Sequence, residues 1–599
     1  MNLLKKAGQL SLVALALGVL SCEAEDQVKP KPAPEHTQAG DMIKLGKQLE
    51  NPYSVENMRL AWANIKSSTS HARVYNFDIE PTDLYVRFYP KNEKELNLLE
   101  ADSLFLFDYP LDYEILNQGS YYVDSTGNQE GKWYYTSVPI DYTFPNIEYE
   151  ILEELFLIDE DIDNASSNGR STLPRQFLHD LEDEALRLTD NWEEAIDAPD
   201  APNARPSKRN PQGHVRVWDT ERQQLVGVEG VRVRTRRWFS YGYAWTNEAG
   251  YYRIDRGYRR DVHYTVFFEN QSGFKIWSTT LDLSKASHHV GKHTRSGINI
   301  DMSTNSRAWR FATVNNAAVK YRRYCNQFGI GLPPSNIRIA AVDKVGGGAA
   351  PMLRRTWGVF GFTSKSDLLA FFYKANGISL TLNQIAVMIK FALPDIVIKA
   401  ASSQGTAAVY ETTFHEMAHA SHYQQAGNAN WVKYINYIIT YGSYGDGTGN
   451  NVGLAALGEA WGYHIGHRLT LEEFSTRGLR TDNSVITWIG FEDFTPLNVG
   501  SKDDDLTTFF DSTINPDQRI TRWEGWIPAG IMQDIVDNNA DALRPGFVDN
   551  VSGYSLQNLY QALDKDVVSP QEFRDRLLRE NNNMDQEDLE NLFEAYYWN

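Results

Sequence analysis

The stretch "TTFHEMAHASHY", residues 412–423, carries three histidines and a glutamate at a spacing that predicts its fold. The longer segment "AAVYETTFHEMAHASHYQQAG" has no internal proline and reaches its first glycine at Gly427, a natural end for an α-helix. On a helix, His415 and His419 point to the same side, one turn apart. Two imidazoles placed in this way can bind one tetrahedral Zn²⁺ ion, at distances of about 2.0 to 2.1 Å. The stretch therefore predicts a helix that carries two ligands of a metal site.

Glu416 is expected to lie beside this metal site. It follows His415 directly, so it is rotated by about 100° around the helix and does not reach the ion as a ligand. A carboxylate there can accept a proton from a water molecule activated by Zn²⁺, which lowers the pKa of bound water to about 7. The pattern H-E-x-x-H thus predicts hydrolysis with Glu416 as the general base. The alternative is a helix with partly buried histidines and no metal.

A catalytic zinc site needs a third protein ligand, and Glu459 is the candidate. It lies in "NVGLAALGEAWGYHIGHRLT" (451–470), a second predicted helix made mostly of apolar and small residues. A single carboxylate in such surroundings needs a partner, which is either a dication or a neighbouring Arg or Lys. Glu459 is therefore the candidate for the third ligand, beside His415 and His419, of one Zn²⁺ ion per chain.

The H-E-x-x-H motif and a glutamate 39 intervening residues later resemble the gluzincin metallopeptidases. "FHEMAHASHY" together with "GEAWGYH" is similar to a group of Bacteroidetes-type lipoprotein metallopeptidases. The resemblance covers residues 303–599 and implies a mainly helical, zincin-like α+β domain with those three zinc ligands and Glu416 as general base and acid. It also implies that a peptide substrate pairs with the edge of a sheet, for which "NIRIAAVD" and "DIVIKAA" are strand candidates. The metzincin family is excluded, because its motif needs Gly at 422 and His at 425, where this chain has His422 and Gln425.

Tyr463 marks a departure from the gluzincin pattern. Thermolysin-like members have an aspartate four residues after the glutamate ligand, which orients a histidine, and here that position is Tyr463. Its phenol lies one turn from Glu459 and is the first candidate to donate a hydrogen bond to the oxyanion of a tetrahedral intermediate. His464, His467 and Tyr423 are the alternatives for this role, and a packed tyrosine is the alternative for Tyr463.

The first 22 residues are typical of a targeting segment. Lys5 and Lys6 precede the apolar run "LSLVALALGVL", which is too short for a comfortable membrane span. The following "VLSC" resembles a bacterial lipobox, which implies a signal peptide over 1–22, lipidation of Cys22 and a tether over 23–40. The chain is then expected to be an outer membrane lipoprotein facing the cell surface or the periplasm. A plain secretory signal is the alternative.

The composition describes an ordinary globular chain that is too long for a single core. It has 599 residues, 42% of them hydrophobic, and a formal charge of -20 that argues against nucleic acid as a partner.

Residues 41–200 mix helix and strand signals, which predicts an α+β domain of unassigned role. Its helix candidates are "SVENMRLAWANIKS", with Ser54 as N-cap, and "KNEKELNLLEAD", and its strand candidates are "DLYVRFYP" and "SLFLFDYP".

A proline-rich linker over 201–212 separates two stretches of opposite charge. Residues 148–200 hold 17 Asp and Glu against three Arg, whereas 205–260 hold 13 Lys and Arg against five acids. The two stretches are either separate solvated faces or surfaces through which two domains dock.

Residues 213–302 are predicted to be all-β, because apolar residues alternate along several short segments. "GHVRVWDTERQQLVGVEGVRVRT" followed by "TNEAGYYRI" is similar to the carboxypeptidase regulatory-like domains, which are small transthyretin-like β-sandwiches and usually accessory modules. The histidine-rich "SHHVGKH" (287–293) is interpreted as a solvated loop, because no carboxylate or cysteine completes a metal site there. "DDD" at 503–505 and "DNNAD" at 537–541 are interpreted as solvated loops and not as calcium sites.

Together these features predict a zinc-dependent peptidase that acts on peptides or proteins. An endopeptidase is favoured, because no clamp for a chain terminus is evident. One alternative is a non-catalytic surface lipoprotein that binds glycan or protein, with a structural zinc whose fourth ligand is His422, His464 or His467. Another is zinc-dependent hydrolysis of a non-peptide bond. Glu416 separates the first alternative from catalysis, because a structural site has no use for a carboxylate beside an open position.

Overall fold

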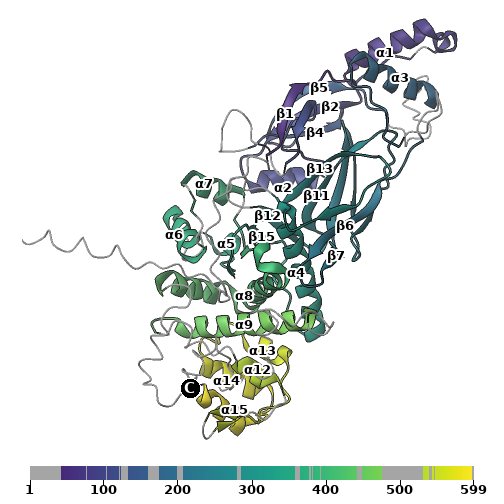
Figure 1. Cartoon of the computed structure of the whole chain (residues 1–599). Helices are drawn as coiled ribbons and strands as arrows, with labels where there is room; N and C mark the ends of the chain where they lie inside the picture. Colours follow the sequence, from purple (N-terminus) through teal and green to yellow (C-terminus); the bar gives the residue numbers. More distant parts are fainter. Residues whose placement is uncertain are drawn as a thin grey trace, which may run out of the picture.

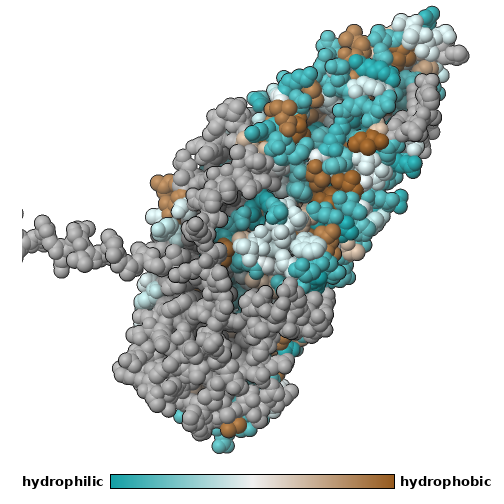
Figure 2. Space-filling model, viewed as in Figure 1, coloured by the Kyte–Doolittle hydropathy of each residue, from teal (hydrophilic) through white to brown (hydrophobic). Residues whose placement is uncertain are grey.

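The computed structural model describes residues 42–75, 77–102, 104–119, 122, 132–158, 174–197, 207–278, 285–357, 364–376, 379–380, 382–391, 393–441, 448–474, 530–537, 542–544 and 547–596. The predicted signal peptide with Cys22, the tether, the "DDD" loop and residues 538–541 lie outside this set. No helix among the described residues has the length and apolar character that crossing a membrane requires. On the face seen in Figure 2, hydrophobic residues form small patches separated by hydrophilic surface.

The N-terminal part is an α+β unit, as predicted. Ser54 accepts a hydrogen bond from Asn57 N and so caps the first helix. Its helices are α1 (Val55–Ser68), α2 (Glu93–Ala101) and α3 (Arg175–Leu188), with the 3₁₀ turn η1 (Ser70–Val74). Its antiparallel sheets are β4 (Tyr134–Pro139), β2 (Asp83–Tyr89) and β5 (Glu148–Leu155) in that order, and the pair β1 (Lys44–Gln48) and β3 (Tyr113–Asn117).

One strand predicted in this unit is wrong. The described residues of "SLFLFDYP" are irregular except for a single β-bridge between Phe107 and Tyr135. One backbone carbonyl within this stretch and one just after it accept hydrogen bonds from arginine side chains. Arg234 donates to Leu106 O at 3.0 Å, and Arg236 donates to Leu111 O at 3.2 Å. The arginines thus take the place of a partner strand.

The β-rich part consists of two sheets, which agrees with the all-β prediction. The smaller sheet contains β10 (Tyr251–Arg253), β6 (Gln212–Asp219), β14 (Ile300–Met302) and β7 (Gln224–Gly227). The larger contains β9 (Ser240–Trp245), β8 (Val231–Arg237), β11 (Val262–Asn270), β12 (Phe274–Ser278) and β13 (Ser287–His293). The last of these is "SHHVGKH", so its interpretation as a loop is wrong. Pairing along β11 outweighs its weak strand propensity.

The larger sheet continues past residue 302 into the part predicted as a separate unit. β12 pairs in parallel with β15 (Ile337–Val342), which pairs in parallel with β17 (Ile396–Lys399). The antiparallel strand β16 (Gly348–Ala349) then ends the sheet among the described residues. Both predicted strands, "NIRIAAVD" and "DIVIKAA", are confirmed, and neither is the edge. The β-rich part and the C-terminal part therefore contribute strands to one sheet, and their buried apolar residues form one hydrophobic core.

The C-terminal part is mainly helical, as predicted, and α8 and α9 lie side by side in it (Figure 1). Helix α4, which carries the buried thiol Cys325, packs between the sheets and α8. The elements are α4 (Arg307–Phe328), α5 (Leu353–Thr356), α6 (Lys365–Asn376), α7 (Leu382–Phe391), η2 (Ser402–Gln404), α8 (Gly405–Tyr441), α9 (Val452–Phe474), α12 (Ile531–Val536), β18 (Ala542–Arg544), β19 (Phe547–Val548), α13 (Leu556–Ala562), α14 (Pro570–Glu580) and α15 (Gln586–Ala595).

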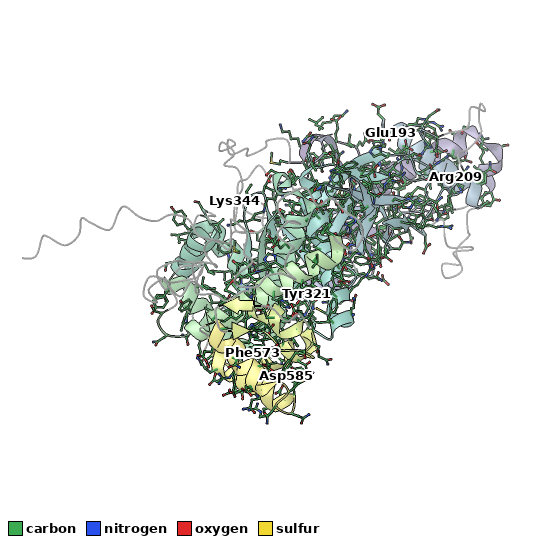
Figure 3. All side chains as sticks on the ribbon, turned by 60° about the horizontal axis from the view of Figure 1, so that its bottom comes forward. Glu193, Arg209, Tyr321, Lys344, Phe573 and Asp585 are labelled. Carbon is green, nitrogen blue, oxygen red and sulfur yellow. The ribbon has the colours of Figure 1, made fainter. Side chains whose placement is uncertain are left out.

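Opposite charges join the N-terminal unit to the β-rich part, so the docking hypothesis is confirmed. Asp183 on α3 pairs with Arg260 at 2.6 Å, and Glu193 lies 3.9 Å from Arg237. Glu193 lies where the two parts meet (Figure 3). The acids on α3 and in the segment after it therefore face part of the basic stretch, whereas Glu148 and Glu150 on β5 pair with cations of their own unit.

Candidate metal centre

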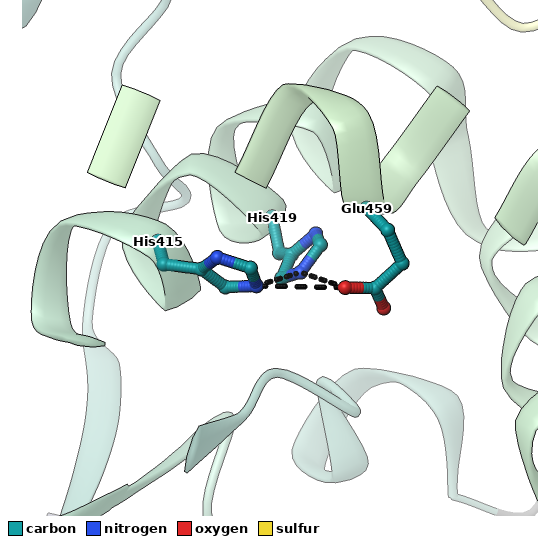
Figure 4. A group of neighbouring side chains, drawn as sticks. All are labelled: His415, His419 and Glu459. Atoms are coloured by element: carbon teal, nitrogen blue, oxygen red, sulfur yellow. Dashed lines mark hydrogen bonds and ion pairs between the residues drawn. The ribbon is translucent and has the colours of Figure 1, made fainter. Parts of the chain in front are cut away.

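His415 and His419 on α8 and Glu459 on α9 converge on one point (Figure 4). The two imidazole Nε2 atoms are 3.0 Å apart. Glu459 Oε2 lies 3.6 Å from Nε2 of His415 and 3.9 Å from Nε2 of His419. All three side chains are buried. The three residues that the sequence predicts as ligands are thus brought together.

These distances fit a bound metal ion. Ligand atoms about 2.0 to 2.1 Å from a tetrahedral ion are about 3.4 Å from one another. The measured separations of 3.0, 3.6 and 3.9 Å lie on both sides of this value. Among the described residues, no other group of histidine, cysteine and acidic side chains comes together in this way. The group can hold a metal ion.

Burial keeps His419 in the form that binds metal. Desolvation, followed by the neighbouring His415 and His422, lowers the pKa of His419 well below its usual value. The ring is therefore neutral at pH 7, and a neutral imidazole has a lone pair for an ion.

Glu416 is buried next to this group. Its side chain is 1% exposed, and neither carboxylate oxygen has a hydrogen-bond partner among the described residues. Burial, and after it the charge of Glu459, raises the pKa of Glu416 well above its usual value, while Lys399 acts in the opposite direction. A buried carboxylate without a partner is costly. Its position beside three converging donor atoms makes a reacting molecule or an ion the natural partner.

Tyr434 holds Glu459, the candidate third ligand, through a contact that was not predicted from the sequence. The hydroxyl of Tyr434 donates a hydrogen bond to Glu459 Oε1, which leaves Oε2 turned to the histidines. The predicted helix end at Gly427 is where the chain leaves helical geometry, with φ of 80°. The chain then resumes as a second helical segment that carries Tyr434. A glycine stop followed by an aromatic-rich helical pattern is the only sequence signal for this arrangement.

Replacing Tyr434 with phenylalanine is expected to weaken metal binding by about 10-fold, because a group that orients a ligand typically contributes this much. Competition with a chelator of known affinity measures the change. Tyr441→Phe is the matched control, since Tyr441 lies at the end of the same helical segment and is 43% exposed. Equal metal affinity in Tyr434→Phe and Tyr441→Phe would contradict the role of Tyr434.

Glycines on one face of α9 let it approach α8 closely. Gly458, Gly462 and Gly466 recur every four residues and so lie on one side of the helix. A Cβ atom built on Gly462 would lie 2.9 Å from His415 Nε2 and 2.9 Å from His419 Cε1. One built on Gly466 would lie 3.2 Å from His415 Cβ. This spacing is visible in the sequence and could have been used to predict which face of α9 meets α8.

Gly462→Ala is expected to weaken metal binding by about 10- to 100-fold, because the new methyl group would displace both imidazoles. The measurement is metal affinity by chelator competition, together with circular dichroism of the same sample. Normal helicity with weaker metal binding is the expected result. Unchanged affinity would mean that the imidazoles can move aside without loss, contrary to the geometry described.

The other predicted candidates lie around the group and are not part of it. The ring of Tyr463 is 4.9 Å from the ring of His415 and stacks on His467 at 6.2 Å. His467 Nδ1 lies 2.7 Å from Glu411 Oε1. His464 is fully buried, and neither ring nitrogen has a hydrogen-bond partner among the described residues. The rings of His422 and Tyr423 pack on Trp431, 5.6 and 5.8 Å away.

The β-rich part holds both metal-site helices, which the sequence did not indicate. In the turn after β6, Thr220 N donates to Thr406 Oγ1 at 2.9 Å, and Thr406 N donates to Thr220 Oγ1 at 2.7 Å. Arg222 pairs with Asp219 and with Glu473, each at 2.6 Å. Because Thr406 lies in the first turn of α8 and Glu473 in the last turn of α9, this turn fixes the two helices relative to each other.

Comparisons of the chain with family models, with curated proteins and with solved structures find no match. A function is therefore argued from the residues of the site.

Proposed function

We propose that the chain is a zinc-dependent peptidase, with an endopeptidase favoured, and that Glu416 is its general base. The observation that carries this proposal is the carboxylate of Glu416, which is buried beside the metal group and has no hydrogen-bond partner among the described residues. A structural zinc site would need no such group. The structural alternative also requires a fourth ligand, and neither His422, His464 nor His467 belongs to the group of donors.

His415, His419 and Glu459 would hold the zinc ion. Two imidazoles and one carboxylate are a ligand set of catalytic zinc sites, which keep one position open. When bound there, Zn²⁺ polarises the scissile carbonyl and makes a water molecule acidic. Glu416 accepts the proton of that water and passes it to the leaving amine. The low polarity around Glu416 strengthens its interaction with both.

The position of the sheet edge supports a peptide as substrate. Strand β16 ends the large sheet among the described residues and therefore offers backbone groups to an added strand. A Cβ atom built on Gly348 in β16 would lie 2.9 Å from Glu416 Oε1. An extended peptide paired with this edge would run directly past the proposed base. This arrangement agrees with the zincin-like resemblance of residues 303–599, and the transthyretin-like resemblance of 213–302 belongs to the same proposal.

Tyr463 is proposed to donate a hydrogen bond to the oxyanion of the intermediate, since its ring lies against His415 at the site. Tyr463→Phe is then expected to lower kcat by about 10²-fold, with little change in KM or in metal content. Steady-state kinetics on a peptide substrate measure both constants. A variant with wild-type kcat would remove Tyr463 from the mechanism.

The proposed setting is the bacterial outer membrane, where a lipid on Cys22 would anchor the chain with its site facing the cell surface or the periplasm. The lipobox-like "VLSC" supports this location.

Metal analysis of the purified chain, followed by chelation and reconstitution, tests the function. One zinc per chain, and cleavage of a quenched peptide library that chelation abolishes and zinc restores, are expected. Tightly bound zinc without cleavage would favour the glycan- or protein-binding alternative.

A further inference from the structure

A cavity lies between the N-terminal unit and the large sheet, and none of His415, His419 and Glu459 lines it. It has a volume of about 350 Å³ and is lined by residues of α2, β4, β8, β9, β11, β12 and β13. Figure 1 shows α2 lying against the sheet beside β11 and β12. This volume is in the range of sites for small ligands, about 300 to 1,000 Å³.

Arg234 on β8 brings an uncompensated positive charge to this cavity. Its side chain is 4% exposed and lies between the rings of Phe107 and Phe267, 3.8 and 4.3 Å from their centres. Its hydrogen bond goes to Leu106 O, and no carboxylate pairs with it among the described residues. Burial, followed by the charge of Arg232, lowers the pKa of Arg234 to about 9. A buried guanidinium without an anion is costly, so an anion is the missing partner.

The acidic groups of the cavity are already paired with other cations. Glu269 binds Arg232 at 2.8 Å and Lys285 at 2.7 Å, and Glu100 also pairs with Lys285. These ion pairs occupy both carboxylates. Among the described residues, neither carboxylate forms an ion pair with Arg234.

Asp108, the third acidic residue of the cavity, makes only a long ion pair within the described part of the chain. Asp108 lies 3.8 Å from Lys132, and Lys132 Nζ is a buried donor without a hydrogen-bond partner among the described residues. The lining residues include four cationic side chains against three acidic ones, since Lys132, Arg232, Arg234 and Lys285 face Glu100, Asp108 and Glu269. The cavity therefore carries one excess positive charge and a free donor in Lys132.

Aromatic rings complete the walls. Phe105, Tyr243, Phe267 and Trp277 line the cavity together with these cations. The indole N–H of Trp277 is buried and has no hydrogen-bond partner among the described residues. Flat aromatic walls and orphaned donors suit a ring that carries polar substituents.

We propose that this cavity binds a single-ring compound that carries one oxyanion group, such as an acidic monosaccharide. The oxyanion pairs with Arg234 and accepts a hydrogen bond from Lys132, and the ring packs on the aromatic walls. The oxyanion is a carboxylate, a sulfate or a phosphate, which share this chemistry. The site is separate from the proposed peptidase site, so binding there is measured whether or not the chain hydrolyses peptides.

Isothermal titration calorimetry of the full chain tests this proposal with glucuronate, glucose 6-sulfate, glucose 6-phosphate and neutral glucose. At least one of the three anions is expected to bind with a Kd below about 1 mM, and glucose is expected to bind more weakly by at least 10-fold. The anion that binds identifies the oxyanion. In Arg234→Gln, the affinity for that anion is expected to fall by at least about 30-fold.

Arg253→Gln is the matched control and is expected to bind as the wild type does, because Arg253 is an exposed residue of β10 in the other sheet. If Arg234→Gln does not fold, the proposal is tested with Lys132→Gln and Tyr243→Ala. Both side chains are partly exposed, Lys132 by 31% and Tyr243 by 48%, so their substitution is expected to leave the fold intact. Each of these two variants is expected to lose affinity by a few-fold. The proposal is overturned if no anion binds, if glucose or inorganic sulfate binds as tightly as the best anion, or if the lining variants bind like the wild type.

Discussion

Glu416→Gln is expected to lower the rate of peptide hydrolysis by about 10²- to 10⁴-fold while the chain keeps its metal. The amide has nearly the same shape as the carboxylate but accepts no proton. Metal content stays unchanged, because Glu416 is not one of the three converging donors. Stability is expected to be equal or higher, since the substitution removes a buried acid that has no partner among the described residues. Hydrolysis of a quenched peptide, metal per chain and thermal unfolding are measured together.

The matched control for this variant is Glu411→Gln on the same helix. Glu411 pairs with His467 and not with the metal group, and its amide can still hydrogen-bond to that ring. Glu411→Gln is therefore expected to hydrolyse peptide at nearly the wild-type rate. A Glu416→Gln variant that keeps more than about a tenth of the wild-type rate would contradict the role of Glu416.

Glu459→Ala is expected to weaken metal binding by at least about 100-fold and to lower hydrolysis in parallel. The substitution removes one of three donors and leaves the hydroxyl of Tyr434 without its carboxylate acceptor. Two imidazoles alone are a poor site for Zn²⁺, which takes four ligands. Chelator competition measures the affinity, and activity is followed as zinc is added. Excess zinc is expected to restore part of the activity, because Glu416 is still present.

Glu472→Ala is the control for this variant, since Glu472 lies on the same helix α9 and outside the metal group. It is expected to bind metal and hydrolyse peptide as the wild type does. If Glu459→Ala binds zinc as tightly as Glu472→Ala, Glu459 is not a ligand.

The convergence of His415, His419 and Glu459 was predictable because its signals are local. Two histidines one turn apart on a helix without breakers fix their common side, and one acid in an apolar helix needs a partner. Tyr434 gave no such signal. A tyrosine in an aromatic-rich helix is usually packed, and its contact with Glu459 depends on the change of direction at Gly427. The direction of a chain after a glycine in the left-handed region is set by tertiary packing.

The β-rich part shows the same limit at the level of strands. The strand segments β15 and β17 were predicted, but the parallel pairing of β15 with β12 and of β17 with β15 was not, because pairing between distant strands leaves no local pattern. Residues 287–293 are rich in histidine and were interpreted as a loop. They form a strand because they pair with β11. "SLFLFDYP" shows the reverse, because the side chain of Arg234 takes the carbonyl of Leu106, at which a partner strand was expected.

The most direct test of the proposed peptidase compares zinc-loaded wild-type chain and Glu416→Gln on one quenched peptide library. Cleavage by the wild type, a loss of about 10²-fold or more in the variant and the same zinc content in both proteins are expected. Equal zinc content with no cleavage by either protein would contradict the proposal, as would equal cleavage by both.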